Sequence, residues 1–195
     1  MGSGARELDA VPLVVGPLYG LRTWRTTGER GAERLRGPYS GTVWPTGGAW
    51  LRAVCAAGDA HAVPAAGCAC GVYGWHPTRR SARSALAVRR EVAGIVEARG
   101  PVEVHAEGFR AREGRPRALV LHPRSNPHLI QRLAGAYGAD VVEVRGADAL
   151  IDWCAEHGIG LAPAALAALL GAETEAPRRR RWLRLGRRGE AAARG

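Results

Sequence analysis

The first 77 residues alternate between short apolar runs and long polar or glycine-rich stretches. The run LYGLRTWRT at 18–26 has the pattern of a strand of mixed burial. A turn built on Pro45 and two adjacent glycines then leads to a second apolar run at 49–55, which we expect to be another strand. Such a region holds little regular core, so we expect short strands, long loops and an additional element that stabilises them.

Residues 78–90 carry many arginines and few large apolar side chains, which predicts a helix or a polar linker. From 91 to 122 the apolar positions follow a β pattern, and glycines divide this stretch into three or four predicted strands. We therefore expect this stretch to be predominantly β.

Three polar side chains alternate along one of these predicted strands: Glu103, His105 and Glu107. Alternation places them on one face of the sheet, where the imidazole could bind a metal or act as a general base. If Glu107 and Gly108 form a hairpin turn, His105 faces Arg110 and Glu103 faces Arg112. Cross-strand charge pairing on a solvated sheet then explains this face better than catalysis.

Beyond residue 122 the apolar period lengthens to that of a helix. In NPHLIQRLAGAYG we expect Asn126 to be the N-cap, Pro127 the first helical residue and Gly138 the end of the helix. A strand DVVEV and a second helix ADALIDWCAEHG follow, the latter burying Cys154 on its apolar face. The order strand, helix, strand, helix from 117 to 157 predicts a parallel strand pair.

A cysteine-rich stretch between 55 and 76 carries the most specific chemistry. Cys55, His61, Cys68 and Cys70 have the spacing C-x5-H-x6-C-x-C, in loops that contain several glycines and Pro64. Thiolates and imidazoles are the ligands that structural zinc prefers, four in a closed tetrahedron. His76 is the alternative fourth ligand, and ordinary buried thiols or a redox or iron–sulfur centre remain alternatives to zinc.

Four segments together resemble an uncharacterised actinobacterial protein family with a C-x-C-G-[IV]-Y motif followed by a G-x-V-x-x-H-x-x-G-x-R-A segment. The segments are GLRTWR at 20–25, VWPTGGAWLRAVC at 43–55, CACGVYGWH at 68–76 and VAGIVEARGPVEVHAEGFRA at 92–111. The resemblance covers about residues 18–160 and implies a shared two-part architecture. It implies no activity, because none is assigned to that family.

We therefore predict an α+β fold in three parts. A β-rich part at 1–84 holds the zinc site, an α+β domain at 85–172 contains the β-α-β-α unit, and residues 173–195 form a basic, disordered tail. No segment approaches the length of a membrane span, and the apolar run at 11–19 is interrupted by two prolines, so we expect a cytoplasmic protein without a secretion signal. In a reducing compartment the cysteines are thiols or ligands.

The net charge of +10 is unevenly distributed, and lysine is absent from the chain. Half of this charge lies in residues 173–195, where four consecutive arginines precede Trp182: Arg178, Arg179, Arg180 and Arg181. Such a tail could hold nucleic-acid phosphates or an anionic membrane surface, or be a solvated extension.

A second candidate anion site is the loop LHPRSNPHL at 121–129, which lies between a parallel strand and a helix start. Arg124 and Ser125 would supply donors there. The favoured function is a non-catalytic, zinc-stabilised binding module that contacts an anionic partner through its tail, with a protein partner also open. The alternative is a metal-dependent or phosphate-handling enzyme using His105, His122 and Arg124, which requires these three residues to converge on one pocket.

Overall fold

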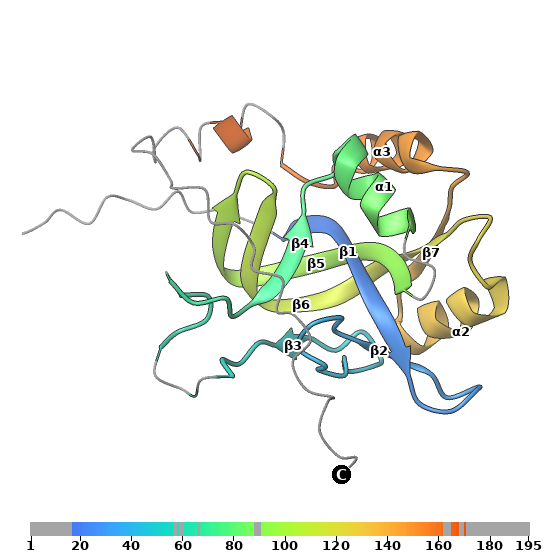
Figure 1. The fold of residues 1–195 in the computed structure, drawn as a ribbon, viewed down its shortest axis with the longest axis horizontal. Coiled ribbons are helices and arrows are strands. Elements are labelled where there is room, and N and C mark those ends of the chain that lie inside the picture. Colours follow the sequence, from blue (N-terminus) through green and yellow to red (C-terminus); the bar gives the residue numbers. More distant parts are fainter. Residues whose placement is uncertain are drawn as a thin grey trace, which may run out of the picture.

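A mixed sheet with helices on both sides organises the chain in the computed structural model (Figure 1). The structure describes residues 17–56, 58, 61–65, 67–87, 91–161, 165–167 and 170. The strands and helices follow in chain order: β1 (Leu18–Thr27), β2 (Arg34–Arg36), β3 (Leu51–Arg52), β4 (Val72–Trp75), α1 (Arg79–Ala87), β5 (Glu91–His105), β6 (Gly108–Leu121), α2 (Pro127–Tyr137), β7 (Asp140–Glu143) and α3 (Ala147–Glu156). The expected α+β class is confirmed.

Strands from both sides of the predicted boundary at 84/85 belong to the same sheet. β1 pairs antiparallel with β5 from Leu18↔Ala98 to Arg25↔Glu91, and β4 pairs with both β6 and β1. The strand pairs β1–β5, β5–β6, β6–β4 and β4–β1 therefore form a closed circuit. The predicted division does not separate two sheets.

The stretch from 91 to 122 forms two long strands, and the prediction of three or four strands was wrong. β5 and β6 make one hairpin, with register irregularities between Ile95 and Val96 and between Arg99 and Val102. Gly100, at φ 81°, occupies the second irregularity and bends β5 without ending it. The predicted strand at 49–55 is likewise reduced to the two residues of β3.

The expected register of this hairpin was also wrong. The residues between β5 and β6 are Ala106 and Glu107, so His105 faces Gly108 and Glu103 faces Arg110. Gly108 is the first residue of β6, and a Cβ there would lie 2.2 Å from the carbonyl oxygen of Gly74 on β4. Close approach of a neighbouring strand, rather than a turn, requires this glycine.

The predicted parallel unit is confirmed. β6 and β7 pair in parallel from Ala118↔Asp140 to Leu121↔Glu143. α2 connects them and has the expected ends: the Asn126 side chain accepts a hydrogen bond from the Leu129 N–H, and Gly138 is left-handed at φ 61°.

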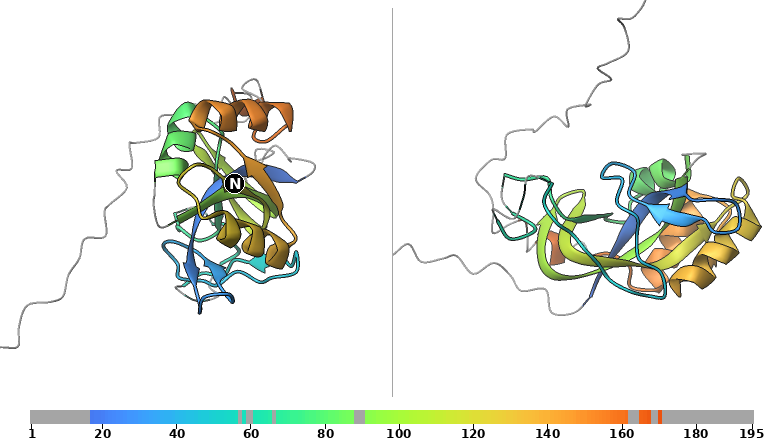
Figure 2. Two further views of the ribbon diagram at one scale, coloured as in Figure 1. Left: turned by 90° about the vertical axis from the view of Figure 1, so that its right-hand side faces the viewer. Right: turned by 90° about the horizontal axis from the view of Figure 1, so that it is seen from below.

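The two faces of the sheet carry separate apolar clusters, and helices cover both faces (Figure 2). One face packs against α2, whose Tyr137 is completely buried together with Trp24 and Trp44. The other face packs against α1 and α3, with Leu150 and Cys154 of α3 in its centre. The sheet thus lies between α1 and α3 on one side and α2 with the loop around Trp44 on the other.

Candidate metal centre

The cysteine-rich loop is positioned by two short strands that pair with β6. β3 pairs at Gly114 and Glu113, and β4 pairs from Ala111 to Gly108. The backbone N–H of Ala53 donates to the carbonyl of Arg112 between these two stretches, at 2.8 Å. Both ends of the loop at 53–71 are therefore held close together on one strand, which brings residues distant in sequence to one place.

The loop gathers the four predicted ligands. One ligand atom from each of Cys55, His61, Cys68 and Cys70 lies within 4.8 Å of the others. The Sγ atoms of Cys55 and Cys68 are 3.6 Å apart, and the Sγ of Cys70 lies 4.0 Å from Nδ1 of His61. A tetrahedral zinc ion with Zn–S bonds of about 2.3 Å has edges of about 3.8 Å between its sulfur ligands. The cluster has the size of such a coordination shell.

The electrostatics of the cluster favour a thiolate at one position. Hydrogen bonding, first from the backbone of Cys70 and then from the side chains of Cys55 and Cys70, lowers the pKa of Cys68 to about 7. Burial raises the pKa of Cys70, and the neighbouring sulfur of Cys68 adds to the effect. A cluster in which Cys68 ionises more readily than Cys70 suits a site that loses a further proton when a cation binds.

The buried side chain of Arg110 binds the cysteine-rich loop through hydrogen bonds to its backbone. Its side chain is 7% exposed and lies on β6 opposite Glu103 of β5, with which it forms an ion pair. One guanidinium nitrogen donates to the carbonyl oxygens of Cys68 and Cys70, and the other donates to that of Ala65 at 3.3 Å. This side chain therefore fixes the backbone of the loop at Ala65, Cys68 and Cys70. The contact of Arg110 with the loop was not predicted, because the register expected from the sequence placed Arg110 opposite His105.

The structure distinguishes His61 from His76 as the fourth ligand. His76 is 4% exposed and its Nε2 donates to the carbonyl of His105 at 3.0 Å, while burial lowers the pKa of its imidazole. His76 does not belong to the cluster, and neither does Cys154, which lies in the apolar core beneath α3.

The residues of the predicted enzyme site do not converge. His105 ends β5 and contacts the Glu103 carboxylate at 3.3 Å, whereas His122 follows the other end of the β5–β6 hairpin. Arg124 lies beside His122, and the Ser125 hydroxyl accepts a hydrogen bond from the His122 N–H at 3.2 Å. The expected cleft containing His105 together with His122 and Arg124 is therefore absent from the part of the chain that the structure describes.

The predicted basic tail cannot be located relative to the metal centre. Residues 173–195, with Arg178 to Arg181, lie outside the described residues, as do residues 1–16. Among the described helices, none combines the length and the apolar character needed to cross a membrane.

Comparison of the chain with protein-family models, with curated proteins and with solved structures finds no match. The resemblance to an actinobacterial family stays a prediction.

Proposed function

We propose that the protein is a non-catalytic, zinc-stabilised cytoplasmic binding module that contacts an anionic partner. The observation that carries this proposal is the approach of three sulfur atoms and one imidazole to within 4.8 Å of one another. Four protein ligands complete a tetrahedron and leave no position for a water or a substrate, which is the arrangement of structural zinc sites. Thiolate-rich sites also select zinc over hard cations such as magnesium and calcium.

The location of the cluster supports a stabilising role. The loop at 53–71 follows the two-residue β3, and its described residues contain no helix or strand before β4. A metal joining Cys55 to the Cys68–Cys70 pair would close this loop and fix β3 and β4 on the same edge of β6. Metal binding and folding of this region would then be coupled.

The metal is tested by elemental analysis of the purified full chain, and we expect about one zinc per chain. Cys68→Ser should release the zinc and lower the melting temperature. Cys154→Ser is the matched control, since it changes the same atom outside the cluster and should leave the zinc content unchanged. Metal-free wild-type protein whose melting temperature does not respond to added zinc would overturn the proposal.

The anionic partner is assigned to the basic tail on charge grounds. Four consecutive arginines followed by Trp182 combine counterion release with stacking on bases or insertion into a lipid interface. Changing Arg178 to Arg181 to glutamine in the full chain should abolish salt-sensitive binding, and changing the same four residues to lysine should preserve it. Single-stranded DNA, RNA and vesicles with anionic lipid are the three probes. Equal binding by the glutamine and lysine variants would exclude the tail as the contact.

A further inference from the structure

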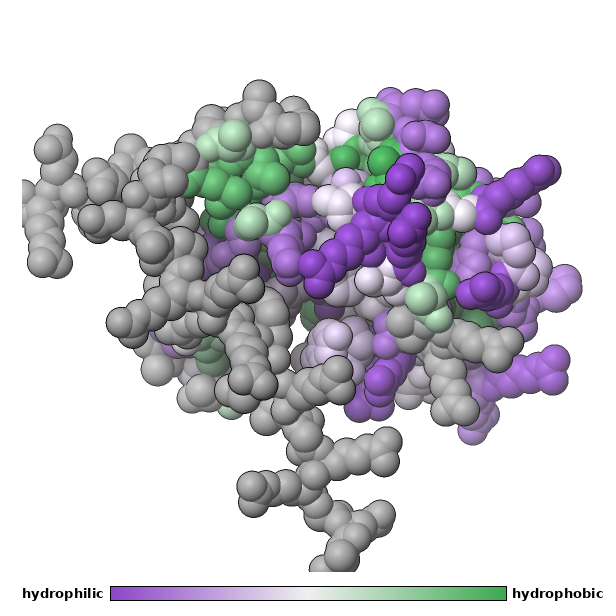
Figure 3. All heavy atoms as spheres, turned by 45° about the horizontal axis from the view of Figure 1, so that its top comes forward, coloured by the Kyte–Doolittle hydropathy of each residue, from purple (hydrophilic) through white to green (hydrophobic). Residues whose placement is uncertain are grey.

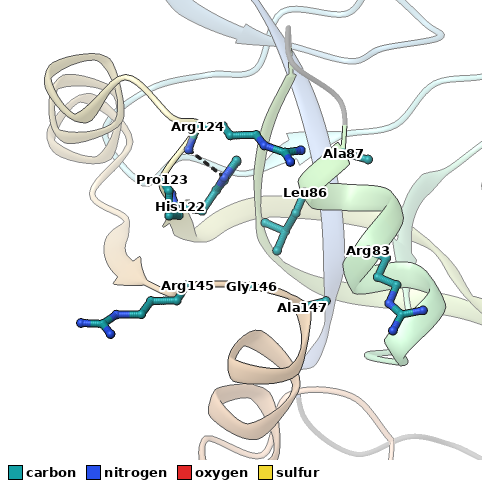
Figure 4. A pocket seen from close by; sticks show the side chains of 9 residues that line it. All are labelled: Arg83, Leu86, Ala87, His122, Pro123, Arg124, Arg145, Gly146 and Ala147. Atoms are coloured by element: carbon teal, nitrogen blue, oxygen red, sulfur yellow. Dashed lines mark hydrogen bonds between the residues drawn. The ribbon is translucent and has the colours of Figure 1, made fainter.

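A pocket with a cavity volume of about 360 Å³ lies where α1, the β6–α2 loop and the start of α3 meet (Figure 4). It is distant in the fold from the metal centre, which lies at the start of β6, whereas the pocket lies beyond its end. The residues that line it are Arg83, Leu86, Ala87, His122, Pro123, Arg124, Arg145, Gly146 and Ala147. Three arginines from three different segments therefore surround one cavity.

These three arginines have no acidic partner among the described residues, unlike arginines close to them in sequence. Arg79, on the same helix as Arg83, pairs with Asp148 at 2.8 Å, and Arg117 near the end of β6 pairs with Asp140 at 2.7 Å. Within the described residues, no ion pair involves Arg83, Arg124 or Arg145. The rim of the pocket thus carries three arginines without an acidic partner among the described residues, and Figure 3 shows strongly hydrophilic side chains beside apolar ones on this helix-covered side.

The position of the pocket in the sheet is a second observation. β6 and β7 are parallel, His122 directly follows β6 and Arg145 lies two residues after β7, so the pocket lies at the carboxyl ends of both strands. Ligands of α/β units bind at this edge, where loops of adjacent strands diverge. The first turn of α3 also opens here, and its N-cap, Gly146, provides no side-chain acceptor for the free N–H groups.

The side chains in the pocket have distinct orientations. Figure 4 shows Arg124 extending from its loop toward the C-terminal end of α1, while the guanidinium of Arg145 points outward. The backbone N–H of Arg124 donates to Nδ1 of His122 at 3.3 Å. Nδ1 is therefore an acceptor, and Nε2 of the neutral ring is a donor. Arg124 and His122 can contact one anionic group from the same side.

The remaining walls are apolar. Leu86 and Ala87 of α1, Pro123 and Ala147 complete the lining. A bare inorganic anion would gain nothing from these side chains, whereas an organic molecule with a charged end would bury its apolar body against them. We propose that this pocket binds a small organic phosphate, with the phosphate group held by Arg124, His122 and the N-terminus of α3. The residues that line this site include none of the metal centre.

The test uses the zinc-loaded full chain and calorimetric titration at constant ionic strength. AMP is the probe, adenosine is the same molecule without its phosphate, and inorganic phosphate is the same charge without an organic body. We expect saturable binding of AMP, weaker binding of inorganic phosphate and none of adenosine. Arg124→Gln should weaken AMP binding by roughly tenfold or more, since it removes a charge-assisted hydrogen bond.

Arg30→Gln is the matched control, because Arg30 is exposed, has no ion pair among the described residues and lies outside the pocket. It removes the same charge and should leave AMP affinity unchanged, and the tail is identical in both variants. Melting temperature and zinc content confirm that each variant is folded. The proposal is overturned if AMP does not bind, if Arg124→Gln and Arg30→Gln behave alike, or if only a single-stranded oligonucleotide binds.

Discussion

The guanidinium of Arg110 pairs with the carboxylate of Glu103 on the neighbouring strand and donates to the loop that carries two of the candidate metal ligands. This arrangement joins the β5–β6 hairpin to the cysteine-rich loop through one buried side chain. The loop carbonyls of Ala65, Cys68 and Cys70 have their donor in this side chain. Removing it would leave these carbonyl acceptors without this donor and would break the ion pair with Glu103, whose carboxylate also contacts His105 at 3.3 Å.

We therefore predict that Arg110→Met destabilises the protein by about 3 kcal/mol and accelerates loss of metal to a chelator. Arg112→Met is the control, because Arg112 lies two residues further along β6 and has no ion pair in the described part of the chain. Urea denaturation gives the stability, and a colorimetric chelator gives the rate of zinc release. Equal effects of the two substitutions would show that Arg110 does not support the loop.

Cys154 should make the stability of the fold depend on pH in the alkaline range. Its side chain is 1% exposed, and burial raises the pKa of its thiol from 9.0 to about 12. Because the folded-state pKa lies above the unfolded-state value, this contribution to stability is complete below pH 9 and is lost as the pH rises toward 12.

The matched variant is Cys154→Ala, which lacks the titrating group. We expect wild-type protein to be more stable than the variant at neutral pH by about 1 kcal/mol, since the alanine leaves a small cavity. The difference in free energy of unfolding, measured by urea denaturation, should shrink and then change sign across the interval between pH 9 and 12, because each unit of the pKa shift corresponds to about 1.4 kcal/mol. A difference independent of pH would mean that the thiol ionises equally in both states.

Local signals predicted the parts of the fold that depend on neighbouring residues. The ends of α2 are encoded within a dozen residues by Asn126, Pro127 and Gly138, and the parallel pairing of β6 with β7 follows from the order of strands and helices. The cysteine and histidine spacing likewise predicted which four residues approach one another. Each of these predictions needed only residue type and spacing.

The wrong predictions concern residues whose role depends on contact with a segment distant in the sequence. Gly108 has the sequence signature of a turn. The structure needs a glycine there because the carbonyl of Gly74 leaves no room for a Cβ, and this contact depends on the pairing of β4 with β6. The resulting shift in register hid the partnership of Glu103 with Arg110. The pocket arginines on α1 and after β7 were also not predicted together, because no sequence spacing relates Arg83 to Arg145.

The hydroxyl of Tyr137 connects α2 to a loop about one hundred residues earlier in the chain. It donates to the carbonyl of Trp44 at 3.1 Å and accepts from the N–H of Leu35 at 2.8 Å, in a completely buried position. Tyr137→Phe should lower the free energy of unfolding by about 2 kcal/mol, because it leaves a buried N–H without its acceptor. Tyr39→Phe makes the same chemical change at a residue that is 93% exposed and should alter stability by less than about 0.5 kcal/mol. Thermal and urea unfolding of the two variants measure the difference, and equal losses would contradict the assigned role of the hydroxyl.

Gly94 should be among the glycines of β5 and β6 that tolerate no side chain. A Cβ at this position would lie 2.3 Å from the carbonyl oxygen of Ala118 and 3.0 Å from the ring of Trp24. Both neighbours are fixed, since Ala118 pairs with β5 and β7 and Trp24 is completely buried. Gly94→Ala must therefore displace backbone, and we expect a loss of about 3 kcal/mol.

Gly135 supplies the opposite case within the same molecule. It lies in α2, its position is exposed, and a Cβ there would meet nothing within 4 Å. Gly135→Ala should stabilise the protein by about 0.5–1 kcal/mol, because alanine loses less backbone entropy in a helix. Urea denaturation of both variants tests the pair, with zinc content as a check on the metal centre. A neutral or stabilising Gly94→Ala would contradict this prediction. The added methyl group would then have found room, and β5 would not approach β6 and β1 as closely as the pairing at Gly94 requires.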